Sequence, residues 1–390
     1  MDLRPLRPKL TVAMPTIPLD LPDIPPEEAY AAAASAGDAH APRRFEDALA
    51  AHCGRRHAIA CATGPAAAWA ALAGLRLSPG DEVICSALVP DNTLLAMAAM
   101  GVRPVFVDVD PARMVASPAA VEAAQTPRTR AVVAAVGAAG QAGIEAVAAV
   151  TRRLELPLLE DGGQAFGSLS GQRLLGTIGR ASFFDFGHGA PMTAWCGGAL
   201  LTDDDRLAES ARKALTDPCC AGLLPLGAPM PPHAAALGLA QLHRLPEILA
   251  RRHALARCYL RHLLEIPDLI LPDLQDGETH AWPVLWARLS TDYRAAQRDD
   301  ILAGLLAHGI HAGKALRCAH RMPACVERFG KTTALPVAEA LSKRTLRLPL
   351  FNRMREEQVE DVCRALTAEL LKARLKMNDW PEGGQVNLED

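Results

Sequence analysis

The feature that most restricts the fold of this chain is a series of short, almost wholly apolar segments that alternate with helical stretches. Helices are expected between them, for example over 65–75, where Pro65 suits a first helical position, and over 93–101. Strands that are apolar along their whole length are typical of a parallel sheet covered on both faces. The sequence therefore predicts a large α/β domain. The expected strands are HAIACAT (57–63), DEVICSAL (81–88), PVFVDVD (104–110), AVVAAVG (131–137), LPLLED (156–161), ASFFDF (181–186) and GGALLTD (197–203).

The 390 residues allow a second domain beside this one. A long helical stretch over 234–265 leads out of the large domain. The strand TLRLPL (345–350) and a helix over 356–373 then predict a smaller α+β unit. The first residues are proline-rich and predict an extended segment, which either lies across a partner subunit or hangs loose. The expected units are an extended arm (1–26), a large α/β domain that opens with two short helices (27–240), a small C-terminal α+β domain (241–372) and a polar tail (373–390).

Charge and cysteine content restrict the classes of molecule that this protein is expected to bind. The net charge is −3, and no long basic or acidic block occurs, which argues against nucleic acid or an anionic membrane surface. Ten cysteines without paired or metal-like spacing are typical of reduced thiols in a cytoplasmic protein. No run of about 18 apolar residues predicts a membrane span. We expect a soluble cytoplasmic protein whose partner is a small molecule or another protein.

Six segments, in this order along the chain, carry a resemblance to a known family: LSPGDEVICSA, GVRPVFVDVDP, TPRTRAVVAAVGAAGQ, LPLLEDGGQAFGS, ALGLAQLHRLPEILARRHALA and LPVAEALSKRTLRLPL. The chain resembles the DegT/StrS-type aminotransferases, which act on nucleotide-linked keto-sugars and related natural-product precursors. The resemblance implies the aspartate-aminotransferase-like fold of type I pyridoxal-phosphate enzymes, with a mainly parallel seven-stranded sheet and a smaller C-terminal α+β domain. It also implies a homodimer with active sites at the subunit interface.

The resemblance further implies where the cofactor would be held. Asp161 matches the aspartate that pairs with the pyridinium nitrogen, and Gln164 matches the polar residue beside the ring. Gly64 and Ala66 lie where backbone amides at a helix start bind the phosphate. The alternative for Asp161 is a helix or turn cap that follows a strand, and the inherited cofactor site is the favoured interpretation.

Other family positions carry residues that cannot do the family's chemistry. Ala190 stands in the position of the lysine that forms the Schiff base, between FDF (184–186) and the pair Gly197 and Gly198. The remaining departures are Asp185 for a phosphate-binding serine, Pro65 for a serine or threonine, Pro90 for the ring-stacking aromatic, and Gly227 for an asparagine supplied to the neighbouring subunit.

These departures together predict weak cofactor binding. A hydrogen bond to a charged group contributes roughly 1.5–3 kcal/mol, so losing two or three of them removes roughly 3–9 kcal/mol. We therefore expect a degenerate, non-transaminating homologue in a biosynthetic pathway, either a homodimer or paired with an active homologue, with a sugar or amino compound as ligand. The alternative is an active pyridoxal-phosphate aminotransferase of a keto-sugar or natural-product precursor, either one whose lysine has been replaced by Ala190 or one that uses His188.

Three further side chains are weaker candidates. His188 could act as a base or be an ordinary loop histidine. Lys314 and His320, in GIHAGKALRCAH, could contact an anionic substrate, although a solvated lysine is the usual interpretation. A metal site would require convergent geometry that spacing does not reveal, so none is predicted. The side chains it would draw on are Asp161, Asp185, His188 and Cys196.

Overall fold

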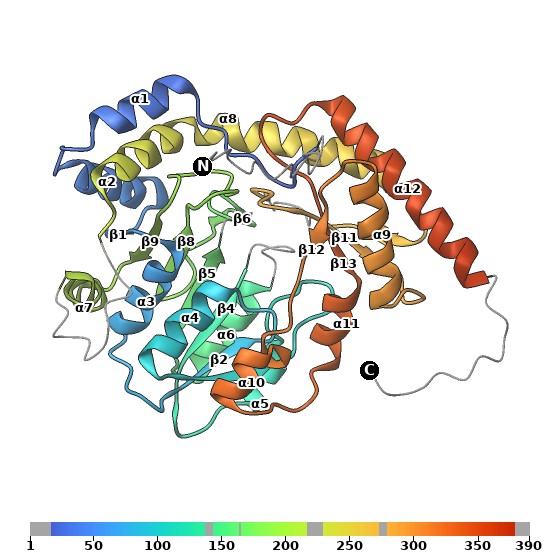
Figure 1. Cartoon of the computed structure of the whole chain (residues 1–390). Helices are drawn as coiled ribbons and strands as arrows, with labels where there is room; N and C mark the ends of the chain where they lie inside the picture. Colours follow the sequence, from blue (N-terminus) through green and yellow to red (C-terminus); the bar gives the residue numbers. More distant parts are fainter. Residues whose placement is uncertain (1–16, 137–142, 164, 217–228, 273–278, 379–390) are drawn as a thin grey trace, which may run out of the picture.

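The computed structural model describes residues 17–136, 143–163, 165–216, 229–272 and 279–378. Its centre is a seven-stranded sheet in the order β1-β9-β8-β5-β4-β2-β3 (Figure 1). Strand β9 runs antiparallel to both neighbours, while the β8-β5-β4-β2-β3 pairings are all parallel. The mainly parallel sheet expected from the sequence is confirmed. Its strands are β1 (His57–Cys61), β2 (Glu82–Ser86), β3 (Arg103–Val107), β4 (Thr129–Ala135), β5 (Leu158–Gly163), β8 (Ala181–Asp185) and β9 (Gly198–Thr202).

Helices cover both faces of this sheet, as apolar strands require. Neighbouring residues of one strand point to opposite faces, so Val83 packs against one set of helices and Ile84 against the other. One face carries α3 (Gly64–Gly74), α4 (Asp91–Met100) and α7 (Asp205–Thr216). The other carries α2 (Ala41–Cys53), α5 (Pro118–Ala123), α6 (Ile144–Arg153) and the first half of α8 (Pro232–Leu263). Helix α1 (Pro26–Ala34) lies on α8, and β6 (Leu169–Ser170) pairs with β7 (Arg173–Leu174) in a hairpin.

A smaller unit follows and has its own core. Its four-stranded antiparallel sheet has the order β10-β11-β13-β12. The second half of α8 and the helices α9 and α12 pack on it through Tyr259, Ile301 and Leu366. Its elements are β10 (Leu269–Ile270), β11 (Leu285–Leu289), α9 (Ala295–Ala307), β12 (Gly313–Lys314), η1 (Ala319–Arg321), α10 (Pro323–Phe329), α11 (Pro336–Arg344), β13 (Thr345–Leu348) and α12 (Glu356–Asn378).

The described part of the segment before α1, residues 17–25, is extended and packs on the same chain. Ile17 forms a parallel bridge with Ile310, and its N–H donates to the carbonyl of Gly309 at 3.0 Å. Helix α8 spans residue 240, where the boundary between the two domains was expected. One continuous helix therefore joins the two sheets (Figure 1). None of the helices in the described ranges is both long and apolar enough to cross a membrane.

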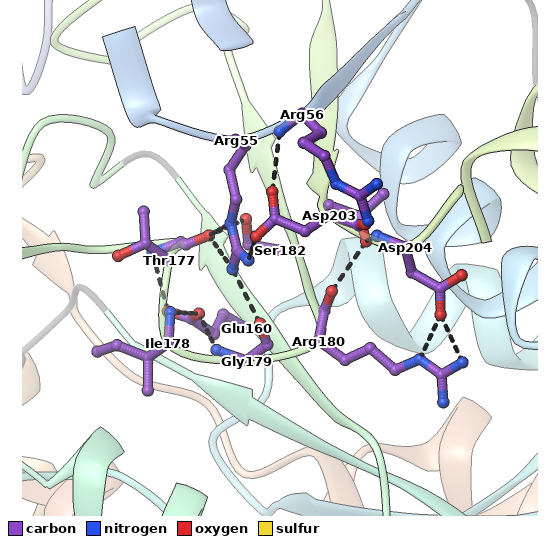
Figure 2. A network of polar contacts seen from close by, with 12 residues as sticks. Arg55, Arg56, Glu160, Thr177, Ile178, Gly179, Arg180, Ser182, Asp203 and Asp204 are labelled. Atoms are coloured by element: carbon purple, nitrogen blue, oxygen red, sulfur yellow. Dashed lines mark hydrogen bonds and ion pairs between the residues drawn. The ribbon is translucent and has the colours of Figure 1, made fainter. Parts of the chain in front are cut away.

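A buried polar network fixes β5 beside its neighbours (Figure 2). The Glu160 carboxylate accepts hydrogen bonds from the backbone N–H groups of Gly176, Ile178 and Gly179 at 2.8, 2.7 and 2.5 Å. Arg55 closes the same loop by donating to the carbonyls of Gly176 and Gly179, both at 2.8 Å. Burial raises the pKa of Glu160, while the three N–H donors oppose that rise. The network holds the strand end where the next residue, Asp161, begins the candidate site.

Candidate functional site

A cavity lies at the carboxyl ends of the parallel strands of the central sheet, where open α/β sheets bind ligands. Its volume is about 530 Å³, within the range of small-molecule sites. The large domain lines it with residues that follow β2, β3, β4, β5 and β8, and the smaller unit closes it. The lining residues are Leu88–Asn92, Arg113–Val115, Ala135, Val136, Gly162, Gly163 and Asp185 from the first, and Pro283, Val284, Lys314–Arg317 and Arg347 from the second.

Asp161 lies just beneath the floor of this cavity, at the end of β5. It is 2% exposed. Thr93 donates its hydroxyl to Asp161 Oδ2 at 2.5 Å, and the Gly163 N–H donates to Oδ1 at 3.0 Å. Burial raises the pKa of Asp161 to about 7; the two donors oppose this rise, and the nearby Asp185 carboxylate adds to it. Near neutral pH the group therefore exchanges its proton, instead of staying a permanent anion.

This carboxyl group makes stability depend on pH. Its ordinary pKa is 3.8, so between about pH 4 and pH 7 the native chain holds a proton that the unfolded chain has released. The free energy of unfolding then falls as pH rises, by up to ~1.4 kcal/mol per pH unit, because ionising the buried group is unfavourable. We expect this fall in the wild type relative to an Asp161→Asn variant, measured by urea denaturation at several pH values from 4 to 8. Parallel profiles for the two proteins would contradict the prediction.

Asp185, at the end of β8, occupies the space in front of helix α3. Its Oδ1 accepts from the Gly187 N–H at 2.8 Å, and its Oδ2 accepts from Asn92 Nδ2 at 3.2 Å. A Cβ added to Gly64 would lie 2.6 Å from Asn92 Nδ2 and 2.7 Å from Asp185 Cβ, so both side chains rest directly on the helix start. Burial raises the pKa of Asp185 against these two donors. The protein's own carboxylate thus fills this position.

The start of α3 offers few donors to an anion. Thr63 caps the helix, and its side-chain oxygen accepts from the Ala66 N–H at 3.2 Å. Pro65, in the first turn, has no N–H to give. Of the two amide positions predicted to bind phosphate, the Ala66 N–H is therefore already in use, and the Cα of Gly64 is packed against the side chains of Asn92 and Asp185.

Ala190 lies in a loop that leaves β8 and returns to β9. It is 6% exposed, and its N–H donates to the Gly187 carbonyl at 3.1 Å. Neither Ala190 nor His188 lines the cavity. The His188 side chain is 57% exposed, and its Nδ1 lies 3.4 Å from Asp20 Oδ1 in the extended segment before α1. Its ring packs edge-on against Trp195. Asp20 also accepts a hydrogen bond from Arg347, which lines the cavity, so His188 is linked to the cavity through that shared carboxylate.

The other predicted positions are divided between the cavity and the core. Pro90 precedes α4 and lines the cavity. Lys314 also lines it, is 53% exposed, and contacts Asp299 at 3.1 Å. His320 does not line it: the side chain is fully buried, and its Nε2 lies 3.1 Å from Glu339 Oε1. Burial works to raise the pKa of Glu339, but hydrogen bonds from His320 and its neighbours outweigh this and lower it to about 2. His320 thus makes a structural hydrogen bond in the core.

Two predicted positions, Gln164 and Gly227, lie outside the described residues. Within the described ranges, no group of three His, Cys, Asp or Glu side chains is placed to hold a metal ion. Sequence reasoning missed the polar residues that complete the site. Asn92 and Thr93 lie two and three residues after the cavity-lining Pro90. Their place soon after the end of β2 was the sequence signal that could have identified them. The cationic side chains that were missed are Arg113, Arg317 and Arg347. Each is a single residue in a loop or in an alternating strand, so no sequence pattern marks it as part of a site.

Comparison with known proteins agrees with this architecture. A family model described as the DegT/DnrJ/EryC1/StrS aminotransferase family matches residues 34–367. The spore coat polysaccharide biosynthesis protein SpsC of Bacillus subtilis (strain 168) is 32% identical over 342 residues, covering 83% of this chain and 88% of SpsC.

Solved structures are similar over almost the whole chain. The aminotransferase TlmJ from Streptoalloteichus hindustanus superposes with a TM-score of 0.83 at 27% identity, covering 92% of this chain and all of TlmJ. DesV from S. venezuelae, solved in complex with a ketimine intermediate, gives 0.79 at 28% identity, covering 88% of this chain and 94% of DesV. The aspartate-aminotransferase-like fold expected from the sequence is confirmed.

Proposed function

This chain belongs to the DegT/DnrJ/EryC1/StrS aminotransferase family, and on that premise we propose that it is a sugar-aminotransferase homologue that no longer transfers amino groups. It keeps the frame and the cavity of the family and acts by binding a small molecule in a biosynthetic pathway. The name of SpsC refers to polysaccharide biosynthesis, which favours a role in saccharide assembly. We further propose that the chain works as a dimer, with itself or with an active homologue.

The distribution of lysines carries this proposal. The sequence contains no lysine between Lys9 and Lys213. That interval supplies every large-domain residue that lines the cavity, so none of the strand ends can offer an amine for a Schiff base. Lys314 is the one lysine among the described lining residues, and it contacts Asp299 at the surface. No residue at a neighbouring strand end can therefore supply the amine that Ala190 lacks.

The residues before α3 do not fit the phosphate of pyridoxal phosphate. In place of a ring of donors, the helix start presents a proline, an amide already bound to Thr63, and the Asp185 carboxylate. One pair of like unit charges at 4 Å costs ~1–4 kcal/mol at dielectric constants of ~80 to ~20. A phosphate would have to displace Asp185 and break its hydrogen bonds to Gly187 and Asn92. The poor fit of a phosphate at the start of α3 supports the proposal that this chain no longer binds the cofactor.

Titration of the purified wild-type protein with pyridoxal phosphate tests the proposal. We expect no saturable change in visible absorbance, because the cavity lacks both the amine and the anion site. We also expect no amino transfer from glutamate to a keto-sugar when the cofactor is present in excess. An active member of the family, measured in parallel, shows that the assay detects both signals. A saturable band together with amino transfer would overturn the proposal.

A further inference from the structure

A second cavity lies at the opposite edge of the central sheet, where the parallel strands begin. Its volume is about 520 Å³, within the range of small-molecule sites. It shares no lining residue with the cavity at the carboxyl ends of the strands, so a ligand held here would lie apart from the family's cofactor position. The lining residues are 74–78 at the end of α3, Asp81 before β2, Arg130 on β4, Pro157 before β5, Arg180 before β8, and Arg206 and Leu207 in the first turn of α7.

Four arginines and one carboxylate supply the charge of this lining. The carboxylate is Asp81, and its Oδ1 lies 3.5 Å from Nε of Arg130. Arg180 has a carboxylate partner just outside the lining, since its Nε and Nη2 donate to Asp204 Oδ2 at 2.9 and 2.5 Å (Figure 2). Two of the four guanidinium groups are therefore already balanced. The four arginines are Arg76, Arg130, Arg180 and Arg206.

The other two arginines have no carboxylate partner among the residues that the structure describes. Arg76 Nε donates to the neutral hydroxyl of Ser210 at 3.0 Å. The Arg206 side chain makes no hydrogen bond or ion pair within the described ranges, where only its backbone N–H has a partner, Asp204. Four guanidinium groups less two carboxylates leave two positive charges in the cavity.

Two aspartates beside Arg206 are held by other cations. Asp203 Oδ2 accepts from Arg55 at 2.6 Å, and Asp205 Oδ1 lies 2.7 Å from Nε2 of His57. Both aspartates line an adjacent pocket that also contains Arg206. Because their carboxylates are taken up by these neighbours, they do not pair with the Arg206 guanidinium.

Arg76 occupies a backbone conformation that favours glycine. Its φ is +56°, in the left-handed region, where a long side chain is uncommon. Residues held in such conformations cluster at ligand sites, where the side chain is needed in spite of the strain. A guanidinium group kept in this position, on the rim of a cavity with excess positive charge, points to a bound anion.

We propose that this second cavity binds a phosphate-bearing small molecule with at least two negative charges. Arg76 and Arg206 would hold the anion, and the N–H groups that Arg130 and Arg180 do not give to aspartate would be further donors. A guanidinium group carries five N–H donors in a rigid fork that matches phosphate oxygens, and a dianion neutralises the two excess charges. The site is independent of the proposed function, because none of its residues takes part in the argument about the cofactor.

Isothermal titration calorimetry with inorganic pyrophosphate tests this inference. We expect saturable binding to the wild-type protein that weakens as potassium chloride is added, because the arginines are exposed to screening. Arg206→Gln should weaken binding about tenfold, the lower limit for a hydrogen bond to a charged group. Arg76→Gly should also weaken it, without lowering the melting temperature, because glycine adopts this φ freely.

Two control variants show where the probe is bound. Arg257→Gln removes an exposed arginine of α8 that lines neither cavity, and it should leave the affinity unchanged. Arg347→Gln removes a cation from the cavity at the other edge of the sheet, and we expect no change there either. Absence of saturable binding, an affinity unchanged in both Arg206→Gln and Arg76→Gly, or weakening in Arg347→Gln but not in Arg206→Gln would each overturn the inference.

Discussion

The Ala190→Lys variant is expected to remain colourless with pyridoxal phosphate and to transfer no amino groups. The substitution supplies an amine in the position that the resemblance assigns to the family's lysine, but it leaves Asp185, Pro65 and the Thr63 cap as they are. An imine cannot accumulate where the phosphate of the aldehyde is repelled. Absorbance spectra over a cofactor titration, with trapping by borohydride and mass spectrometry, measure the outcome.

Addition of Asp185→Ser to Ala190→Lys is expected to produce measurable cofactor binding. Removing the like charge recovers ~1–4 kcal/mol, which corresponds to about fivefold to several hundredfold in affinity. Ala190→Arg with Asp185→Ser is the matched control, because arginine brings a positive charge without an amine that forms an imine. A saturable visible band and turnover in the single Ala190→Lys variant would show that the phosphate site had been intact throughout.

The Arg252→Met variant is expected to lower the free energy of unfolding by about 3–5 kcal/mol. Arg252 is 2% exposed and lies on α8. It donates to the carbonyls of Trp282 at 2.5 Å and Leu350 at 3.0 Å, and to Asn352 Oδ1 at 3.0 Å. Each buried acceptor left without a donor costs ~1–3 kcal/mol. Burial lowers the pKa of Arg252 to about 9, so the side chain remains charged at neutral pH.

Guanidinium denaturation of Arg252→Met beside Arg257→Met measures this effect. Arg257 lies on the same helix but is exposed, so its loss should change stability by no more than about 0.5 kcal/mol. Equal stabilities of the two variants would show that the buried hydrogen bonds of Arg252 contribute nothing. Because Pro283 lines the cavity and follows Trp282, Arg252→Met should also weaken ligand binding.

The central sheet could be predicted from the sequence because each strand is a continuous apolar run. The expected strand at 131–137 corresponds to β4 (Thr129–Ala135), and the expected strand at 181–186 to β8 (Ala181–Asp185). The reversed direction of β9 has no such signal, since apolar content does not encode strand direction. The two-residue strands β10 and β12 are too short to form any pattern.

A site residue could be predicted from the sequence only where its local sequence matched a known motif. Asp161 follows an apolar strand and matches a family motif, so it could be found. The contact of Asn92 with Asp185 joins residues 93 positions apart, and that of Arg347 with Asp20 joins residues 327 positions apart. Such pairs depend on how segments far apart in the sequence pack together, and local sequence does not specify that packing. The same reason explains why His320 was considered for ligand binding although its partner is Glu339.

Helix α8 decides how the two units can move. Its residues up to Leu249 pack in the large domain, and those from Leu255 onward pack in the smaller one. Pro246 lies inside this helix, near the end of the part that packs in the large domain, and it has no N–H to donate to the backbone ladder. A bend at this turn breaks less of the backbone ladder than a bend elsewhere along the rod. Because one helix carries both units, any relative movement of the two would have to bend α8, and the turn at Pro246 is the place where such a bend costs least.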